Sequence, residues 1–109
     1  MVKRGDVVVA VFAGDYGKPR PAVVVQTDLV NQTHSSIVVC PMTSHLEDAP
    51  LFRLSVEPAK ENSLQKPCQI MVDKISAIRR DKVRQVIGRL DDETMVRVNR
   101  SLAFWLGLG

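Results

Sequence analysis

Residues 14–25 read Gly-Asp-Tyr-Gly-Lys-Pro-Arg-Pro-Ala-Val-Val-Val, and this stretch decides how the chain is expected to fold. A turn-prone segment with two glycines is followed, from Ala22, by an apolar run rich in β-branched residues, which favours a strand. The prolines beside Arg20 fix their own φ at about −65° and bias the residue before each toward extended backbone. Arg20 is therefore expected at the mouth of a strand, although a solvated arginine beside an ordinary turn fits the same residues.

Short apolar runs recur on both sides of this stretch. Val7–Phe12 is unbroken and too short for a typical helix, so it predicts a strand buried on both faces. Pro21–Gln26 predicts a second strand, and Ile37–Cys40 a third that must end or reach a sheet edge at Pro41. Phe52–Val56 alternates apolar and polar residues, as in a half-exposed strand.

The second half of the chain gives one more strand, an ambiguous segment and a helix. Residues 68–72 and 74–78 predict one long strand with a bend or bulge at Asp73. Val83–Leu90 fits a helical turn as well as a strand. After it, Asp91 or Asp92 can cap an amphipathic helix that ends at Gly107, with apolar residues three and four apart: Met95, Val98, Leu102, Trp105 and Leu106.

Strands at short spacing sealed by one terminal helix predict a mostly β domain with a C-terminal helix, folded as a small antiparallel barrel. Residues 1–109 show no linker or repeat, so one domain is expected. The 45% hydrophobic and 25% charged residues are typical of a soluble globular protein. No signal-peptide core and no apolar run of about 18 residues is present, so we expect a cytoplasmic protein without a membrane partner.

The charge balance permits a polyanionic partner. Fifteen Lys and Arg against twelve Asp and Glu give a net charge of +3. Only five aromatic residues are present, which argues against an RNA-recognition sheet that stacks bases on aromatic side chains. Cys40 and Cys68 lack metal-ligand spacing and are expected to be buried, reduced thiols, with a disulfide or a reactive thiol as the alternative.

No sequence motif supports chemistry that depends on a metal or a nucleotide cofactor. The chain has no HExxH, no GxSxG and no glycine-rich phosphate loop before a helix. We therefore expect no metal and no cofactor.

The polar residues at predicted strand ends are the remaining candidates for a site. Arg20 precedes the second strand, Thr43 and Ser44 follow the third, and Asp73 with Lys74 interrupts the long strand. An arginine and a hydroxyl can bind a phosphate and stabilise a pentacovalent phosphorus without a metal, and RNA supplies its own 2′-hydroxyl as nucleophile. Asp73 could orient Arg20 or contact the nucleotide.

Each candidate also has a plain structural interpretation. Thr43 and Ser44 could simply form a turn, Asp73 could belong to a bulge or an ion pair, and Lys74 could be a solvated charge. His45 is an available acid or base that nothing in the spacing requires.

Three segments resemble the MazF/PemK family of toxin endoribonucleases. They are Gly5-Asp6 before the first strand, Arg20–Val25 after a glycine-containing turn, and Cys40-Pro-Met-Thr-Ser44. Gly88-Arg89-Leu90 leading into residues 95–108 is similar to that family's closing segment. The resemblance runs through nearly the whole chain in the right order.

This resemblance implies an SH3-like PemK barrel, a homodimer, and metal-independent cleavage of single-stranded mRNA at short motifs. It implies products with 2′,3′-cyclic phosphate and 5′-hydroxyl ends, and a cognate antitoxin that covers the RNA groove. By position, Arg20 matches the family's catalytic arginine and Thr43 its catalytic threonine. Asp73 matches an acidic position near the scissile nucleotide.

Two departures bear on the cut sequence. The turn at residues 13–19 is short and lacks the histidine or glutamate of some members, and Met71 stands where some members carry a basic residue. The residues expected to bind RNA beside the catalytic pair are Asp15, Tyr16, Lys18, Ser44, His45, Asp73 and Lys74.

Two other functional classes fit the same fold. CcdB-like toxins poison DNA gyrase through C-terminal residues, and the Trp-x-Gly within residues 104–109 is reminiscent of that mode, although Trp105 also lies on the apolar stripe of the helix. The third possibility is an RNA-binding module without catalytic activity. The nuclease needs Arg20 and Thr43, the gyrase binder needs residues 105–109, and the idle module needs neither for cleavage.

Overall fold

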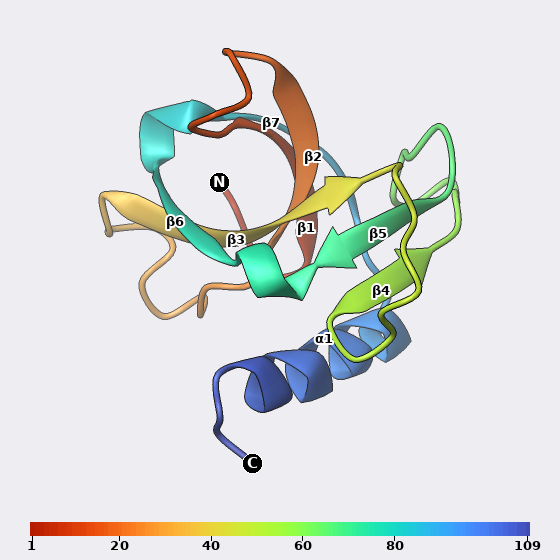
Figure 1. The fold of residues 1–109 in the computed structure, drawn as a ribbon. Helices are drawn as coiled ribbons and strands as arrows, with labels where there is room; N and C mark the ends of the chain where they lie inside the picture. The colour runs from red at the N-terminus through yellow and green to blue at the C-terminus, as the bar shows by residue number, and fades with distance from the viewer.

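The computed structural model describes residues 1–109 and shows a strongly curved antiparallel sheet with one helix packed beneath part of it (Figure 1). Along the sheet the strand order is β4-β5-β3-β2-β1-β7, and β6 pairs with β3. The strands are β1 (Asp6–Val11), β2 (Pro19–Val24), β3 (Ser36–Thr43), β4 (Arg53–Val56), β5 (Cys68–Met71), β6 (Ser76–Arg79) and β7 (Val83–Arg89). The end strands β4 and β7 do not pair with each other, so the sheet is barrel-like without being closed, and the predicted fold class is confirmed.

The first strand is buried on both faces, as its unbroken apolar run predicted. Successive side chains of a strand point to opposite faces, and those of β1 enter two different apolar clusters. Val7 belongs to the larger cluster, whereas Val8 and Ala10 belong to the smaller one. Strand β2 divides in the same way, with Val23 in the larger cluster and Val24 in the smaller.

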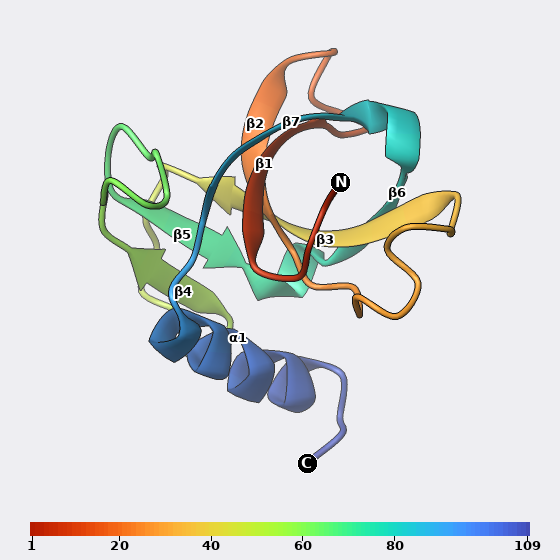
Figure 2. The same ribbon diagram turned by 180° about the vertical axis from the view of Figure 1, so that it is seen from behind.

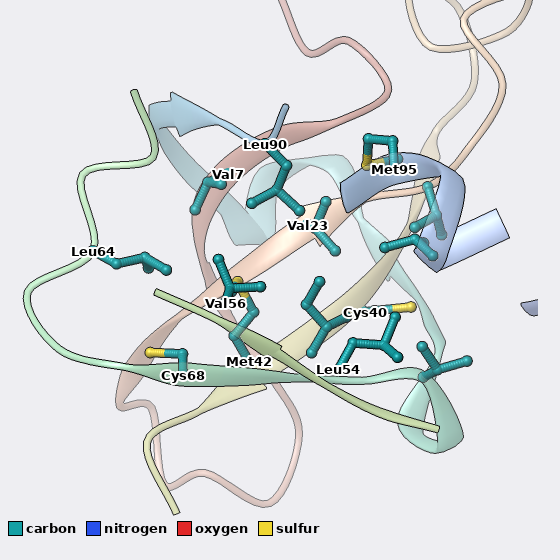
Figure 3. Close-up of a cluster of buried hydrophobic side chains, with 14 residues drawn as sticks. Val7, Val23, Cys40, Met42, Leu54, Val56, Leu64, Cys68, Leu90 and Met95 are labelled. Carbon is teal, nitrogen blue, oxygen red and sulfur yellow. The ribbon is translucent and has the colours of Figure 1, made fainter. Parts of the chain in front are cut away.

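The larger cluster contains 14 buried residues and includes Met95 and Val98 of the helix α1 (Asp92–Trp105) (Figure 3). Seen from both sides, α1 runs beneath β4 and β5 (Figures 1 and 2). The smaller cluster of seven residues comes from β1, β2, β3 and Val2. The two clusters together cover both faces of β1 and β2 with packed apolar side chains.

The predicted C-terminal helix is confirmed. The Asp91 side chain accepts a hydrogen bond of 2.7 Å from the Thr94 amide and so caps the first turn. Gly107 follows the helix with a φ of 72°, which suits a glycine that ends a helix.

The sequence predicted that the third strand either ends or reaches a sheet edge at Pro41, and the first of these alternatives is wrong. Strand β3 continues through Pro41 to Thr43. On one side of β3, β6 pairs with residues 36–39 and β5 pairs with Met42 and Thr43, so Pro41 lies in the gap between these two partners. A residue without an amide proton therefore costs no ladder hydrogen bond on that side.

The prediction of one long strand around Asp73 is also wrong. Residues Val72–Lys74 form a turn of 3-10 helix, η1, that separates β5 from β6. The two strands pair with different parts of β3, and η1 carries the chain from one position to the other. The ambiguous segment after a second 3-10 turn, η2 (Arg80–Lys82), is the strand β7.

The half-exposed pattern of the fourth strand holds for Ser55 but not for Arg53. Arg53 is buried with Leu54 and Val56, because its guanidinium forms an ion pair with a carboxylate brought to it by η1. Alternation of residue types could not show this pairing.

Candidate functional site

A groove of about 590 Å³ opens at one end of the barrel, where three segments distant in sequence meet. Its walls are the β1–β2 turn (residues 12–18), the end of β3 and the β4–β5 loop (residues 57–67). The end of β3 and the β4–β5 loop lie side by side in both views (Figures 1 and 2). The polar lining residues are Asp15, Tyr16, Lys18, Arg20, Thr43, Ser44, Ser63, Gln65 and Lys66.

Arg20 is held in the groove by Asp15 from the preceding turn. Arg20 Nη2 donates to Asp15 Oδ1 at 3.0 Å, and Arg20 Nε lies 2.8 Å from Asp15 Oδ2, although it is not aligned for a hydrogen bond. Both side chains are partly exposed. The pair fixes one edge of the guanidinium, and no hydrogen bond of the structure uses Nη1, the nitrogen on its other edge.

Thr43 comes from the strand next to Arg20. The last residue pair of β2 and β3 at this end of the sheet is Ala22 with Pro41, and Arg20 and Thr43 each lie two residues beyond it. Thr43 Oγ1 accepts a hydrogen bond of 3.0 Å from the His45 amide. Since that bond uses a lone pair, the hydroxyl proton is free to be donated to a ligand in the groove.

Of the nine residues predicted for the site, six line this groove: Asp15, Tyr16, Lys18, Arg20, Thr43 and Ser44. Lys74 lines a smaller recess of about 370 Å³ that shares Asp15 and Arg20 with the groove. His45 lines neither, and its Nε2 lies 3.9 Å from Glu47 Oε1 at the surface.

Asp73 also lies outside the groove, and its partner is Arg53 rather than Arg20. Its carboxylate accepts two hydrogen bonds from the guanidinium, at 2.8 Å from Nε and 3.1 Å from Nη2. The pKa of Arg53 is raised, chiefly by the hydrogen bond to Asp73. Asp73 therefore anchors η1, the turn that carries Lys74, against β4.

Sequence reasoning missed the third wall of the groove. None of the predicted site residues lies between positions 58 and 67, yet Ser63 to Lys66 line the groove. The residues themselves carry only turn signals, so nothing local indicates that the loop folds back toward Arg20.

Both cysteines are free and buried. Burial raises the pKa of Cys40 to about 12, and it also raises the pKa of Cys68, which lines the groove. No three His, Cys, Asp or Glu side chains gather as metal ligands would. The chain contains no helix with the length and apolar character needed to span a bilayer.

The lining of the groove is basic. The lining contains three cationic side chains, Lys18, Arg20 and Lys66, and only one carboxylate, that of Asp15. Two residues with hydroxyl groups, Thr43 and Ser44, lie at the end of β3. Arginine and hydroxyl donors suit phosphate oxygens. The protein is therefore a small barrel-like domain whose groove is lined by three cationic side chains and by hydroxyl groups.

The chain belongs to the family described as PemK-like, MazF-like toxins of type II toxin-antitoxin systems, whose sequence model matches residues 3–106. It is 37% identical to the probable endoribonuclease MazF of Mycolicibacterium smegmatis over 108 residues, which cover 98% of each chain. It is 30% identical to the endoribonuclease EndoA of Bacillus subtilis, covering 99% of this chain and 97% of EndoA.

A solved structure agrees with this assignment in its fold. A mycobacterial endoribonuclease in complex with its cognate antitoxin superimposes with a TM-score of 0.83, covering 100% of this chain and 98% of that one at 22% sequence identity. The resemblance drawn from Arg20–Val25 and Cys40–Ser44 is thereby confirmed at the level of the family.

Proposed function

We propose that this toxin is a metal-independent endoribonuclease that cleaves single-stranded mRNA at short sequence motifs in the groove between the β1–β2 turn and the end of β3. The two relatives described above, MazF and EndoA, are named endoribonucleases, and we assign the same enzyme class to this toxin. We place its action in the cytoplasm, where mRNA is translated.

One observation carries the assignment of the site. Arg20 and Thr43 come from neighbouring strands, each lies two residues beyond the last pair of β2 and β3, and both line one groove. An arginine and a hydroxyl facing the same space can hold two oxygens of one phosphate. Asp15 holds Arg20 by one edge and leaves the Nη1 edge for this task.

The chemistry follows from the substrate. The 2′-oxygen of RNA forms a bond to phosphorus while the bond from phosphorus to the next nucleotide's 5′-oxygen breaks. One proton leaves the 2′-hydroxyl and another joins the departing oxygen, which gives 2′,3′-cyclic phosphate and 5′-hydroxyl ends. Arg20 and the Thr43 hydroxyl stabilise the charge that accumulates on the phosphorane oxygens.

The other basic residues position the RNA chain. Lys18 and Lys66 line the groove and Lys74 lines the adjoining recess, so each can attract a neighbouring phosphate. Tyr16 and Ser44 are exposed in the groove lining, and we assign to them contacts with the nucleotides of the bound RNA. Asp15 is a candidate for proton transfer. His45, which lies outside the groove, can contact RNA only at the edge of the groove. Asp73 contributes indirectly, because its ion pair with Arg53 holds the turn η1 that carries Lys74.

Two protein partners belong to the proposal. The mycobacterial neighbour was solved with its cognate antitoxin, and we assign a cognate antitoxin to this toxin as well. We also assign a homodimer, since Phe104, Leu106 and Leu108 leave apolar surface exposed at the end of α1. Light scattering of the purified toxin tests the dimer.

The gyrase-poisoning alternative has less support. Trp105, its key residue, packs against Phe52 with ring centroids 5.2 Å apart, as expected for an aromatic residue on the apolar stripe of the helix. Both curated relatives are named endoribonucleases.

The test is cleavage of a long single-stranded RNA in excess EDTA, with the cut ends mapped and their chemistry determined. We expect discrete cuts with cyclic phosphate ends, and a loss of at least about a hundredfold in Arg20→Ala. Arg84→Ala is the matched control, because Arg84 is exposed on β7, outside the groove. Wild-type activity in Arg20→Ala would contradict the site, and failure of the wild type to cut several RNAs would contradict the function.

A further inference from the structure

The β4–β5 loop is built as a rigid wall of the groove. Asn62, 5% exposed, directs its side chain into the loop. Its Oδ1 accepts from the amides of Ala59 and Leu64, both at 3.0 Å, and its Nδ2 donates to the Glu57 carbonyl at 3.0 Å. The buried side-chain amide of Asn62 therefore links the backbone groups of Glu57, Ala59 and Leu64.

The same loop is fixed to the barrel through β7. The Arg89 amide donates to the Glu61 carbonyl at 2.7 Å. A Cβ at position 88 would lie only 2.5 Å from that carbonyl oxygen, so the loop can approach β7 this closely only because residue 88 is glycine.

Backbone strain marks this wall and the opposite one. Only two residues other than glycine have a positive φ, Tyr16 at 53° and Ser63 at 58°. Both line the groove, Tyr16 from the β1–β2 turn and Ser63 from the β4–β5 loop. Such conformations persist where the surroundings enforce them, and they concentrate at functional sites.

The rigid loop presents one side chain suited to reading a base. Contacts of arginine, lysine and hydroxyl groups with phosphates position a nucleic acid without reading its sequence. Gln65 is the only residue of the groove lining with a side-chain amide, which offers a donor and an acceptor together. It is exposed, and its single hydrogen bond, from Nε2 to the Ser63 carbonyl, is long at 3.5 Å and readily exchanged.

We propose that Gln65 determines sequence specificity by pairing its amide with the edge of one base beside the scissile phosphate. Single-stranded RNA exposes its base edges, and an unpaired side-chain amide carried on a fixed loop can pair with a donor and acceptor on the same edge. This inference rests on the proposed endoribonuclease function. It assigns the phosphate at the cut to Arg20 and Thr43, and the reading of one base to Gln65 on the β4–β5 loop.

The experiment compares cleavage motifs in a randomised single-stranded RNA pool, sequenced at the cut ends. In Gln65→Ala we expect the base preference at one position beside the cut to fall by roughly 5- to 150-fold, the range of a bidentate base contact. Gln65→Glu keeps the shape but only accepts hydrogen bonds, so at that position it should favour bases that offer an amino or imino proton. Gln85→Ala, an exposed glutamine on β7 outside the groove, should leave the motif unchanged.

The possible outcomes distinguish a failure of the role of Gln65 from a failure of the endoribonuclease function on which it rests. A wild-type enzyme that cuts at a motif, and a Gln65→Ala variant that cuts the same motif with the same base frequencies, would overturn the role of Gln65 alone. A wild-type protein that does not cut the pool would overturn the endoribonuclease and this inference together. Loss of preference at one position, with the rest of the motif retained, supports it.

Discussion

Removing the carboxylate of Asp73 should destabilise the protein strongly, because it leaves the buried Arg53 guanidinium without its main partner. The Arg53 side chain is only 8% exposed and Asp73 16%, and the pair is joined by two hydrogen bonds. Breaking one side of a buried pair costs roughly 3–5 kcal/mol. Glu47 lies 3.5 Å from Arg53 Nη1 and compensates part of the charge, so we expect about 2–3 kcal/mol for Asp73→Ala.

This loss is large for a domain of 109 residues, whose stability is expected at about 5–15 kcal/mol. At about 4–8 °C per kcal/mol, the Tm should fall by roughly 10–20 °C. Urea unfolding can be followed by the fluorescence of Trp105, the only tryptophan, since it packs against Phe52 beside Arg53.

The control is Asp81→Ala, which breaks the ion pair with Arg79 at 2.6 Å. Those side chains are 75% and 60% exposed, so the change should cost less than about 1 kcal/mol. Replacing both buried partners, Arg53→Met with Asp73→Leu, should recover much of the loss. If Asp73→Ala unfolds within about 0.5 kcal/mol of the wild type, the reasoning is refuted.

Three further predictions concern the groove and the core. Thr43→Val should lower kcat by about tenfold or more in the RNA cleavage assay while Thr43→Ser retains activity, since only the hydroxyl is needed. Lys66→Ala should weaken RNA binding at all sequences and reduce the slope of log affinity against log salt by about 0.7, as measured by anisotropy with RNA lacking the scissile 2′-hydroxyl. Cys40, with its pKa raised to about 12, should resist alkylation at pH 8 in the folded state and react in urea, as mass spectrometry can show. The stability that this shift contributes is present below the unfolded thiol's pKa of about 8.5 and is lost as the pH rises toward 12.

Features that depend on neighbouring residues could be predicted from the amino-acid sequence. Apolar runs of β-branched residues gave β1 and β2, an acidic cap and apolar periodicity gave α1, and paired prolines placed Arg20 at a strand mouth. These signals are local, because period, capping and proline geometry act within a few residues. The family could be recognised for the same reason, since its motifs are short and stand in order along the chain.

Which of these residues lie close together depends on how the whole chain folds. Arg20 and Thr43 line one groove because the pairing of β2 with β3 brings the start of one strand to the end of the other. Asp73 pairs with Arg53 because η1 turns the chain at that point. The loop with Gln65 became a wall of the groove because Gly88 lets it approach β7. Each of these contacts joins residues 20 or more positions apart, and a side chain's type does not say which distant partner the folded backbone will bring to it.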